Sequence, residues 1–192
     1  NQISSQPTTQ INKLKKFIFF GNILLLIFCM YYVISDVVSF AKSYIYPLDD
    51  AYIHLSMAKN FAEFGTWGIT KYEFSSTSSS PFFTLLLSFL IKIFGNYQYI
   101  PIILNSVAAL ALIYTLHRIL KDKKILIYGI FLTAIVWLMP MHTMILMGME
   151  HVLHALTLVI CLLFFKKYFE NKSPKYFYFL LIFAFLAVGF RY

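Results

Sequence analysis

Long apolar runs, separated by short clusters of basic residues, restrict this chain to one class of fold. The first run covers residues 17–40 and follows Lys13, Lys15 and Lys16. It is longer than the apolar part of a signal peptide, and no small-residue cleavage site follows it. It is long enough to cross a bilayer as a helix. With 60% hydrophobic and only 12% charged residues, the sequence predicts an all-α, polytopic membrane helical bundle.

The charges between the other apolar runs indicate how these runs are arranged. Residues 81–94 are short for a full span. If this run crossed the membrane, the next run would place Arg118 and the lysines of 121–124 on the outer face. We therefore expect it to lie in the membrane interface, which leaves about five transmembrane helices, two interfacial helices on the outer side and a cytoplasmic N-terminus. The predicted spans are residues 17–40, 97–120, 125–141, 151–165 and 176–190.

The same charge pattern suggests one membrane domain and no separate soluble domain. Residues 1–16 are predicted to be a cytoplasmic N-terminal tail, and residues 17–192 a transmembrane domain with an outer loop at 41–96. The net charge is +8, but the basic clusters lie beside apolar runs and are better explained as topology signals than as a nucleic-acid surface. We expect membrane lipids and no nucleic acid among the partners.

Two adjacent acids, Asp49 and Asp50, follow the first predicted span. Apolar residues then recur at every fourth position from Ile53 to Phe61, as on one face of a helix. The acids would therefore cap the start of an amphipathic helix and favour its dipole, and Gly65 is the predicted stop. This places a carboxylate pair on the outer membrane surface. An exposed pair that only aids solubility is the alternative.

Two further polar positions are candidates for a site. His54 lies one helical turn after Asp50, so the two could pair; alternatively, His54 is an ordinary interfacial residue. Glu150 precedes His151 and His154, but two histidines at i, i+3 differ from the order of a zinc protease. We therefore expect Glu150 to be a helix cap or a wall of the active site, and we predict no metal ligands here.

Taken in order, several segments of residues 17–192 resemble the amino-terminal part of the GT-C membrane glycosyltransferases. These enzymes are relatives of protein O-mannosyltransferases, aminoarabinose transferases and arabinofuranosyltransferases. The most specific feature is the acid pair after the first span combined with the Ser-Pro-aromatic-Thr-Leu segment. The segments are Leu-Asp-Asp-Ala-Tyr-Ile at 48–53, Gly-Thr-Trp-Gly at 65–68, Ser-Ser-Ser-Pro-Phe-Phe-Thr-Leu-Leu-Leu at 78–87, Phe-Gly-Asn at 94–96 and Met-Gly-Met-Glu-His at 147–151.

This resemblance implies transfer of a sugar from a polyprenyl-phosphate donor to a glycan, lipid or protein acceptor. The reaction would take place on the outer face of a bacterial or archaeal plasma membrane. The family's base corresponds to Asp49, with Asp50 as its neighbour, and substrate contacts correspond to Glu150 and Arg191. Members of the family have more spans and often a carboxy-terminal domain, so we expect this chain to be truncated at its C-terminus. An inactive fragment is the alternative to an enzyme that is active alone.

The implied chemistry needs few groups. One carboxylate that accepts the proton of the acceptor hydroxyl is sufficient for a single displacement with inversion, unlike the two carboxylates of ordinary glycosidases. A cation must stabilise the departing phosphate. Arg191, Lys42 and His54 are the candidates for this role. No cofactor is certain, and a divalent cation is another candidate.

Two other classes of protein remain as alternatives. A non-catalytic membrane subunit would share the same spans and loops. A transporter-like protein would place charged residues inside its spans to line a path, and the predicted spans are nearly free of charge between their ends.

Overall fold

The computed structural model describes residues 6–191, which form helices and no strand. The prediction of an all-α fold is therefore confirmed for the described part of the chain. Residues 1–5 of the predicted N-terminal tail lie outside it, and from Gln6 onward the tail continues into the first helix. The helices are α1 (Gln6–Ala41), α2 (Asp49–Phe64), α3 (Pro81–Phe94), α4 (Ile100–Leu120), α5 (Ile125–Leu138), α6 (Met141–Leu146), α7 (His151–Asn171) and α8 (Pro174–Phe190).

Four helical stretches among the described residues are long and apolar enough to cross a membrane, so the chain is an integral membrane protein. They are Thr9–Ala41, Ile100–Leu120, Ile125–Leu146 and His151–Asn171. The fifth predicted span corresponds to α8, whose 17 residues extend about 25 Å, a little less than the apolar core of about 30 Å. The structure thus supports four of the five predicted membrane spans.

The boundaries of the last spans differ from the predicted ones for local reasons. The third predicted span, 125–141, is broken after Leu138, because Pro140 has no N–H to continue the helix. A short α6 then resumes the path to Leu146. The helix of the fourth span continues beyond 165 to Asn171, where Lys172 adopts a positive φ of 50° and ends it.

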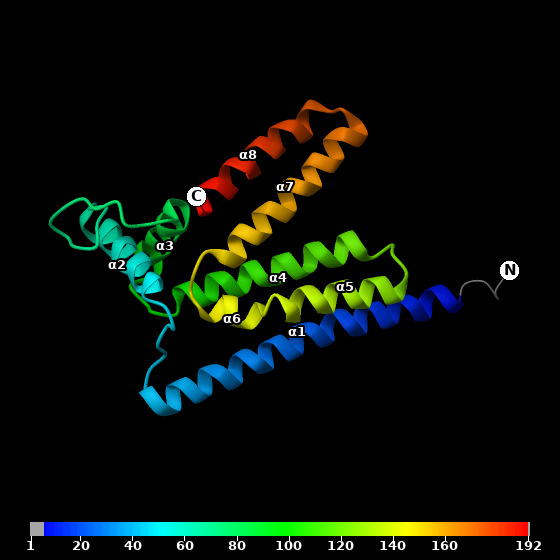
Figure 1. The fold of residues 1–192 in the computed structure, drawn as a ribbon, viewed down its shortest axis with the longest axis horizontal. Helices are drawn as coiled ribbons and strands as arrows, with labels where there is room; N and C mark the ends of the chain where they lie inside the picture. Colours follow the sequence, from blue (N-terminus) through cyan, green and yellow to red (C-terminus); the bar gives the residue numbers. More distant parts are fainter. Residues whose placement is uncertain (1–5, 192) are drawn as a thin grey trace.

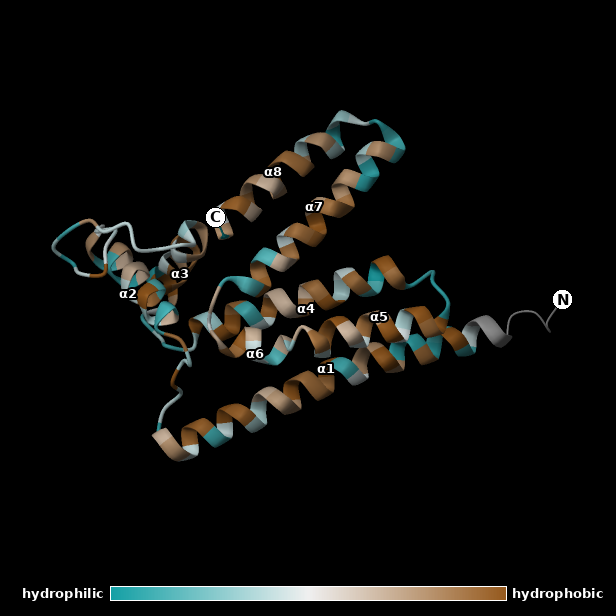
Figure 2. Ribbon diagram, viewed as in Figure 1, coloured by the Kyte–Doolittle hydropathy of each residue, from teal (hydrophilic) through white to brown (hydrophobic). Residues whose placement is uncertain are grey.

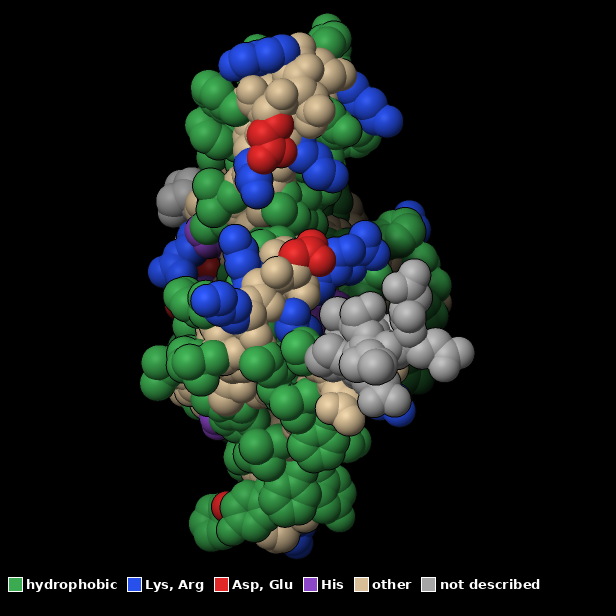
Figure 3. Space-filling view, turned by 90° about the vertical axis from the view of Figure 1, so that its right-hand side faces the viewer, with side chains coloured by type: hydrophobic (Ala, Val, Ile, Leu, Met, Phe, Trp, Pro, Cys, Tyr) green, Lys and Arg blue, Asp and Glu red, His purple; other side chains and the backbone are tan. Residues whose placement is uncertain are grey.

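The loops separate into two groups at opposite ends of the bundle. In Figure 1, α2, α3, α6 and the C-terminus lie at one end, and the N-terminus and the α4–α5 turn lie at the other. Figure 2 shows hydrophobic ribbon along the lengths of the helices, with hydrophilic stretches concentrated in the connections. Lysine and arginine side chains gather over the end that carries the N-terminus and the α4–α5 turn (Figure 3). The connections on either side of each candidate span therefore lie at opposite ends of the bundle.

Two polar contacts hold α1 in the bundle. The buried amine of Lys15 donates to the backbone oxygens of Lys121 (2.5 Å) and Lys123 (2.7 Å), which follow α4. Farther along α1, the amide oxygen of Asn22 accepts a hydrogen bond from the indole N–H of Trp137 on α5 at 2.9 Å. These contacts satisfy polar groups that would otherwise lie unpaired in an apolar environment.

Candidate functional site

The acid pair begins α2, as predicted, but it does not cap the helix. The N-cap is Leu48, and no side-chain cap hydrogen bond forms there. Asp49 and Asp50 occupy the first turn and are exposed, so they still favour the positive end of the helix dipole. The predicted stop is confirmed, because Gly65 adopts a left-handed φ of 70° and its N–H donates to the oxygen of Phe61.

His54 is buried where α2 packs on α3, with only 2% of its surface exposed. Its Nδ1 lies 3.0 Å from the hydroxyl of Thr84 and 3.3 Å from that of Ser78. These two hydroxyls are themselves 2.9 Å apart. Burial lowers the pKa of His54 below its usual value, although the charges of Glu150 and Asp50 act in the opposite direction. A neutral ring can then accept a hydroxyl hydrogen at Nδ1 and present Nε2–H to its other side.

Glu150 lies on that other side. Its Oε2 is 3.8 Å from His54 Nε2, and its Oε1 is 3.5 Å from His151 Nδ1. Burial raises the pKa of the Glu150 carboxyl, but hydrogen bonding from His151 and from the backbone, together with the charge of His151, outweighs this, so the pKa lies below its usual value. Glu150 is therefore a buried carboxylate at the start of α7, where the helix dipole also favours negative charge.

The two acids of the pair are not equivalent with respect to this cluster. Burial lowers the pKa of His54, and the charge of Asp50 acts against this shift. Asp50 and His54 are separated by one helical turn and share a face of α2. The suggested Asp50–His54 pairing is therefore electrostatic, and the polar partners of His54 are instead Thr84, Ser78 and Glu150.

The structure brings Arg191 to the cluster but shows no contact of Lys42 with it. One guanidinium nitrogen of Arg191 is 3.3 Å from His151 Nδ1, beside Glu150. Lys42 is exposed at the end of α1, has a positive φ of 62°, and forms no ion pair with any of residues 6–191. Within those residues, no group of three or more histidine, cysteine or acidic side chains could hold a metal ion.

A group of tyrosines holds the segment that precedes α2. The hydroxyl of Tyr44 donates to the oxygen of Leu146 at 2.6 Å, and that of Tyr46 donates to the oxygen of Gln98 at 2.5 Å. Gly148 has a φ of +70°, and a Cβ built there would lie 2.3 Å from the Tyr46 ring. This close approach requires glycine. The start of α2 and the segment leading to Glu150 are thereby packed on each other.

The hydroxyl residues of the cluster were not among the site residues predicted from the sequence. Ser78 and Ser80 belong to a serine run that looks like a linker, yet both are buried. Thr84 shares the buried face of α3 with Leu87 and Ile91. The available signal in the sequence was Thr84, a polar residue on the apolar face of a short helix. Its partner on α2, His54, could be known only from the fold.

Residues from α2, α3 and α7 thus meet as a histidine between hydroxyls and a buried carboxylate, with an exposed acid nearby. Buried titratable groups with shifted pKa values, held by several helices, are typical of functional sites that handle protons, although structural networks can show them too. A scan against models of protein families and searches of curated proteins and solved structures found no match to this chain.

Proposed function

We propose that this protein is an integral membrane glycosyltransferase that transfers a sugar from a polyprenyl-phosphate donor to an extracytoplasmic acceptor. The order of motifs along the chain is one support. The observation that carries the proposal is the position of Asp50, which is exposed at the start of α2 and shares a helix face with His54, whose ring lies 3.8 Å from the buried carboxylate of Glu150. In this proposal α2 and α3 are interfacial helices on the outer face, and the N-terminus is cytoplasmic.

In the proposed reaction, Asp50 accepts the proton of the acceptor hydroxyl. The hydroxyl oxygen forms a bond to the anomeric carbon while the bond from that carbon to the phosphate oxygen breaks, which inverts the configuration. Arg191 is the cation best placed to stabilise the departing phosphate, because it is exposed beside His151 at the same end of the bundle. Glu150 and His54 are positioning residues that fix the start of α7 and the face of α2.

A transfer assay tests this proposal. Membranes containing the natural protein would be supplied with radiolabelled polyprenyl-phosphate mannose, arabinofuranose or aminoarabinose, and transfer to endogenous acceptors would be measured. Asp50→Asn keeps the size of the side chain but removes the proton acceptor, so transfer should fall by roughly 10²–10⁴-fold. Asp49→Asn should reduce transfer less. Glu63→Gln, at an exposed position near the far end of α2, is the matched control and should transfer normally.

The outcomes separate the possible roles. Loss of transfer in Asp49→Asn, with near-normal transfer in Asp50→Asn, would assign the base to Asp49. Normal transfer in both variants, or none by the unchanged protein from any of the three donors, would contradict the proposal. A non-catalytic membrane subunit would then be the better interpretation. A chelator added to the same assay would show whether transfer needs a divalent cation.

A further inference from the structure

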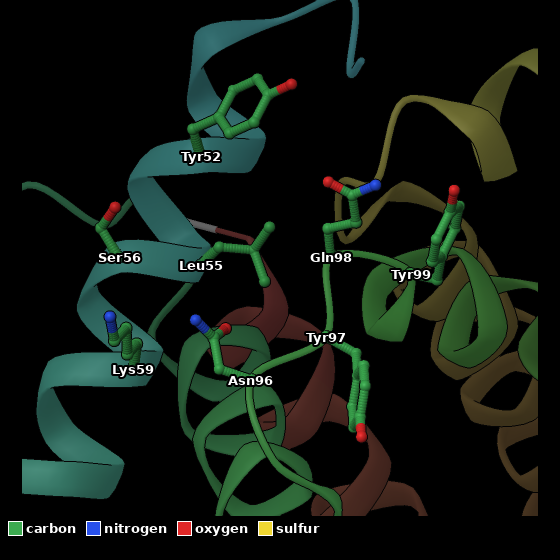
Figure 4. A pocket seen from close by; sticks show the side chains of 8 residues that line it. All are labelled: Tyr52, Leu55, Ser56, Lys59, Asn96, Tyr97, Gln98 and Tyr99. Carbon is green, nitrogen blue, oxygen red and sulfur yellow. The ribbon is translucent and has the colours of Figure 1, made fainter. Parts of the chain in front are cut away.

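A polar pocket with a volume of about 640 Å³ lies between α2 and the segment that joins α3 to α4. Its α2 side is formed by Tyr52, Leu55, Ser56 and Lys59, and its other side includes Asn96 and Gln98. Figure 4 shows the side chain of Asn96 directed back toward Lys59. The pocket therefore presents one amine and several hydrogen-bonding groups at the end of the bundle.

An apolar groove of about 480 Å³ adjoins this pocket at Tyr97, which lines both. The groove lies between α3 and α4 and is lined by Leu90 and Phe94 on one side and by Ile103 and Val107 on the other. Phe94, Ile103 and Val107 are each exposed over about 60% of their surface (63%, 61% and 62%). In Figure 4 the ring of Tyr97 points away from α2. Polar pocket and apolar groove thus form a continuous, two-part surface.

The dimensions of this surface fit one leaflet of a bilayer. From Ile100 to Val107 the groove follows α4 for about 10 Å at 1.5 Å per residue. The apolar half of a bilayer is about 15 Å deep. With the pocket at the level of the head groups, where tyrosines such as Tyr97 are favoured, a groove of this length would reach into the hydrocarbon region.

The charge of the pocket selects the head group. Lys59 forms no ion pair with any residue of the described chain. Among residues 6–191, this lysine is the only charged residue that lines the pocket. A phosphate with an attached hydrocarbon chain would satisfy both parts of the surface at once, whereas a free phosphate would leave the groove unused.

We propose that the pocket and the groove form one binding site for an anionic phospholipid of the bilayer. The phosphate lies beside Lys59, with hydrogen bonds from Ser56 and Asn96, and an acyl chain lies along α3 and α4. The site is separate from the proposed reaction centre. Successive residues of a helix are rotated by about 100° about its axis. Asp50 and His54 therefore lie on one face of α2, and the polar pocket residues of α2 (Tyr52, Ser56 and Lys59) lie on the opposite face. The inference therefore does not depend on the proposed glycosyltransferase activity.

Lipid retention measures this site directly. The protein would be reconstituted into nanodiscs containing equal amounts of phosphatidylglycerol and phosphatidylcholine, and the lipids retained after release would be counted by native mass spectrometry. The unchanged protein should retain phosphatidylglycerol in preference. Lys59→Gln should reduce this preference about fivefold, the worth of one lysine near an anionic lipid surface. Lys92→Gln, on an exposed lysine of α3 that lines neither part, should leave it unchanged.

The groove needs its own variant. Val107→Trp fills the groove and should reduce retention of both lipids, whereas Leu162→Trp, at a similarly exposed position on α7 (66%), should not. Circular dichroism confirms that each variant is folded. Equal retention of both lipids by the unchanged protein, or an equal effect of Lys59→Gln and Lys92→Gln, would overturn the proposal. Displacement of phosphatidylglycerol by inorganic phosphate or preferentially by a polyprenyl phosphate would overturn the assignment of a phospholipid.

Discussion

The contact between Gly148 and Tyr46 gives a quantitative test of how the cluster is held in place. Gly148→Ala has two effects. The residue keeps a φ of +70°, which costs about 1–2 kcal/mol for a residue with a Cβ. The new Cβ also lies 2.3, 2.7 and 3.0 Å from three carbons of the Tyr46 ring, and such overpacking costs about 1–3 kcal/mol. We expect a total loss of about 2–5 kcal/mol in the free energy of unfolding.

Gly65→Ala is the matched control, because Gly65 has the same φ of +70° but no atom within 4 Å of its Cβ position. This variant should lose only the backbone part, about 1–2 kcal/mol. Both variants would be unfolded in mixed detergent micelles by increasing the fraction of a denaturing detergent, with helicity followed by circular dichroism. Equal losses in the two variants would refute the steric argument. In a Tyr46→Ala background, Gly148→Ala should cost no more than Gly65→Ala.

The remaining predictions concern the other end of the bundle, the buried histidine and the orientation of the chain. Lys15→Met removes charged hydrogen bonds to two carbonyls. It should therefore destabilise the protein by about 1.5–3 kcal/mol and speed amide hydrogen exchange in the α4–α5 turn. Lys16→Met, at an exposed position, should have neither effect. Burial lowers the pKa of His54 in the folded protein. Its contribution to the free energy of unfolding is therefore fully present above the usual pKa of 6.5. It is lost as the pH falls below that value, by up to about 1.4 kcal/mol per pH unit. His54→Asn should flatten the decline between pH 6.5 and 5, and an unchanged slope would contradict the pKa shift. In a background without Cys29 and Cys161, a cysteine at the exposed Ser79 should react with an impermeant reagent from outside, and one at Asp122 should not; equal labelling would reject the proposed orientation.

Local chemistry was enough to predict where several elements begin and end. A helix over residues 81–94 and a helix end at Gly65 were expected, and both are found, since proline in a first turn and glycine at a helix end act through their own backbone preferences. The end of α7 could not be predicted in the same way. The apolar run stops at residue 165, but the helix continues through polar residues, where Lys166 and Glu170 lie 3.7 Å apart, because helix geometry does not require an apolar sequence.

The candidate site was only partly predictable for a different reason. Asp49 and Asp50 were recognised as neighbours at a helix start, but their directions differ by about 100°. The spacing of four residues already placed Asp50 on the same helix face as His54, but the neighbours of that face could be known only from the structure. The contacts of His54 with Thr84 and Glu150 join segments far apart in the sequence. Such contacts depend on helix packing, and no spacing in a single sequence contains that information.

The capping contact of Lys15 has a consequence for the time course of membrane insertion. Its carbonyl partners are 106 and 108 residues further along the chain. At a synthesis rate of about 5–20 residues per second, they emerge roughly 5–20 s after Lys15 has been made. During this interval the amine stays in water at the membrane surface, where its charge counts toward orienting α1. When the α4–α5 turn arrives, the same amine is withdrawn into the protein. The burial of Lys15 between the first helix and the α4–α5 turn therefore comes after the first helix itself has been made.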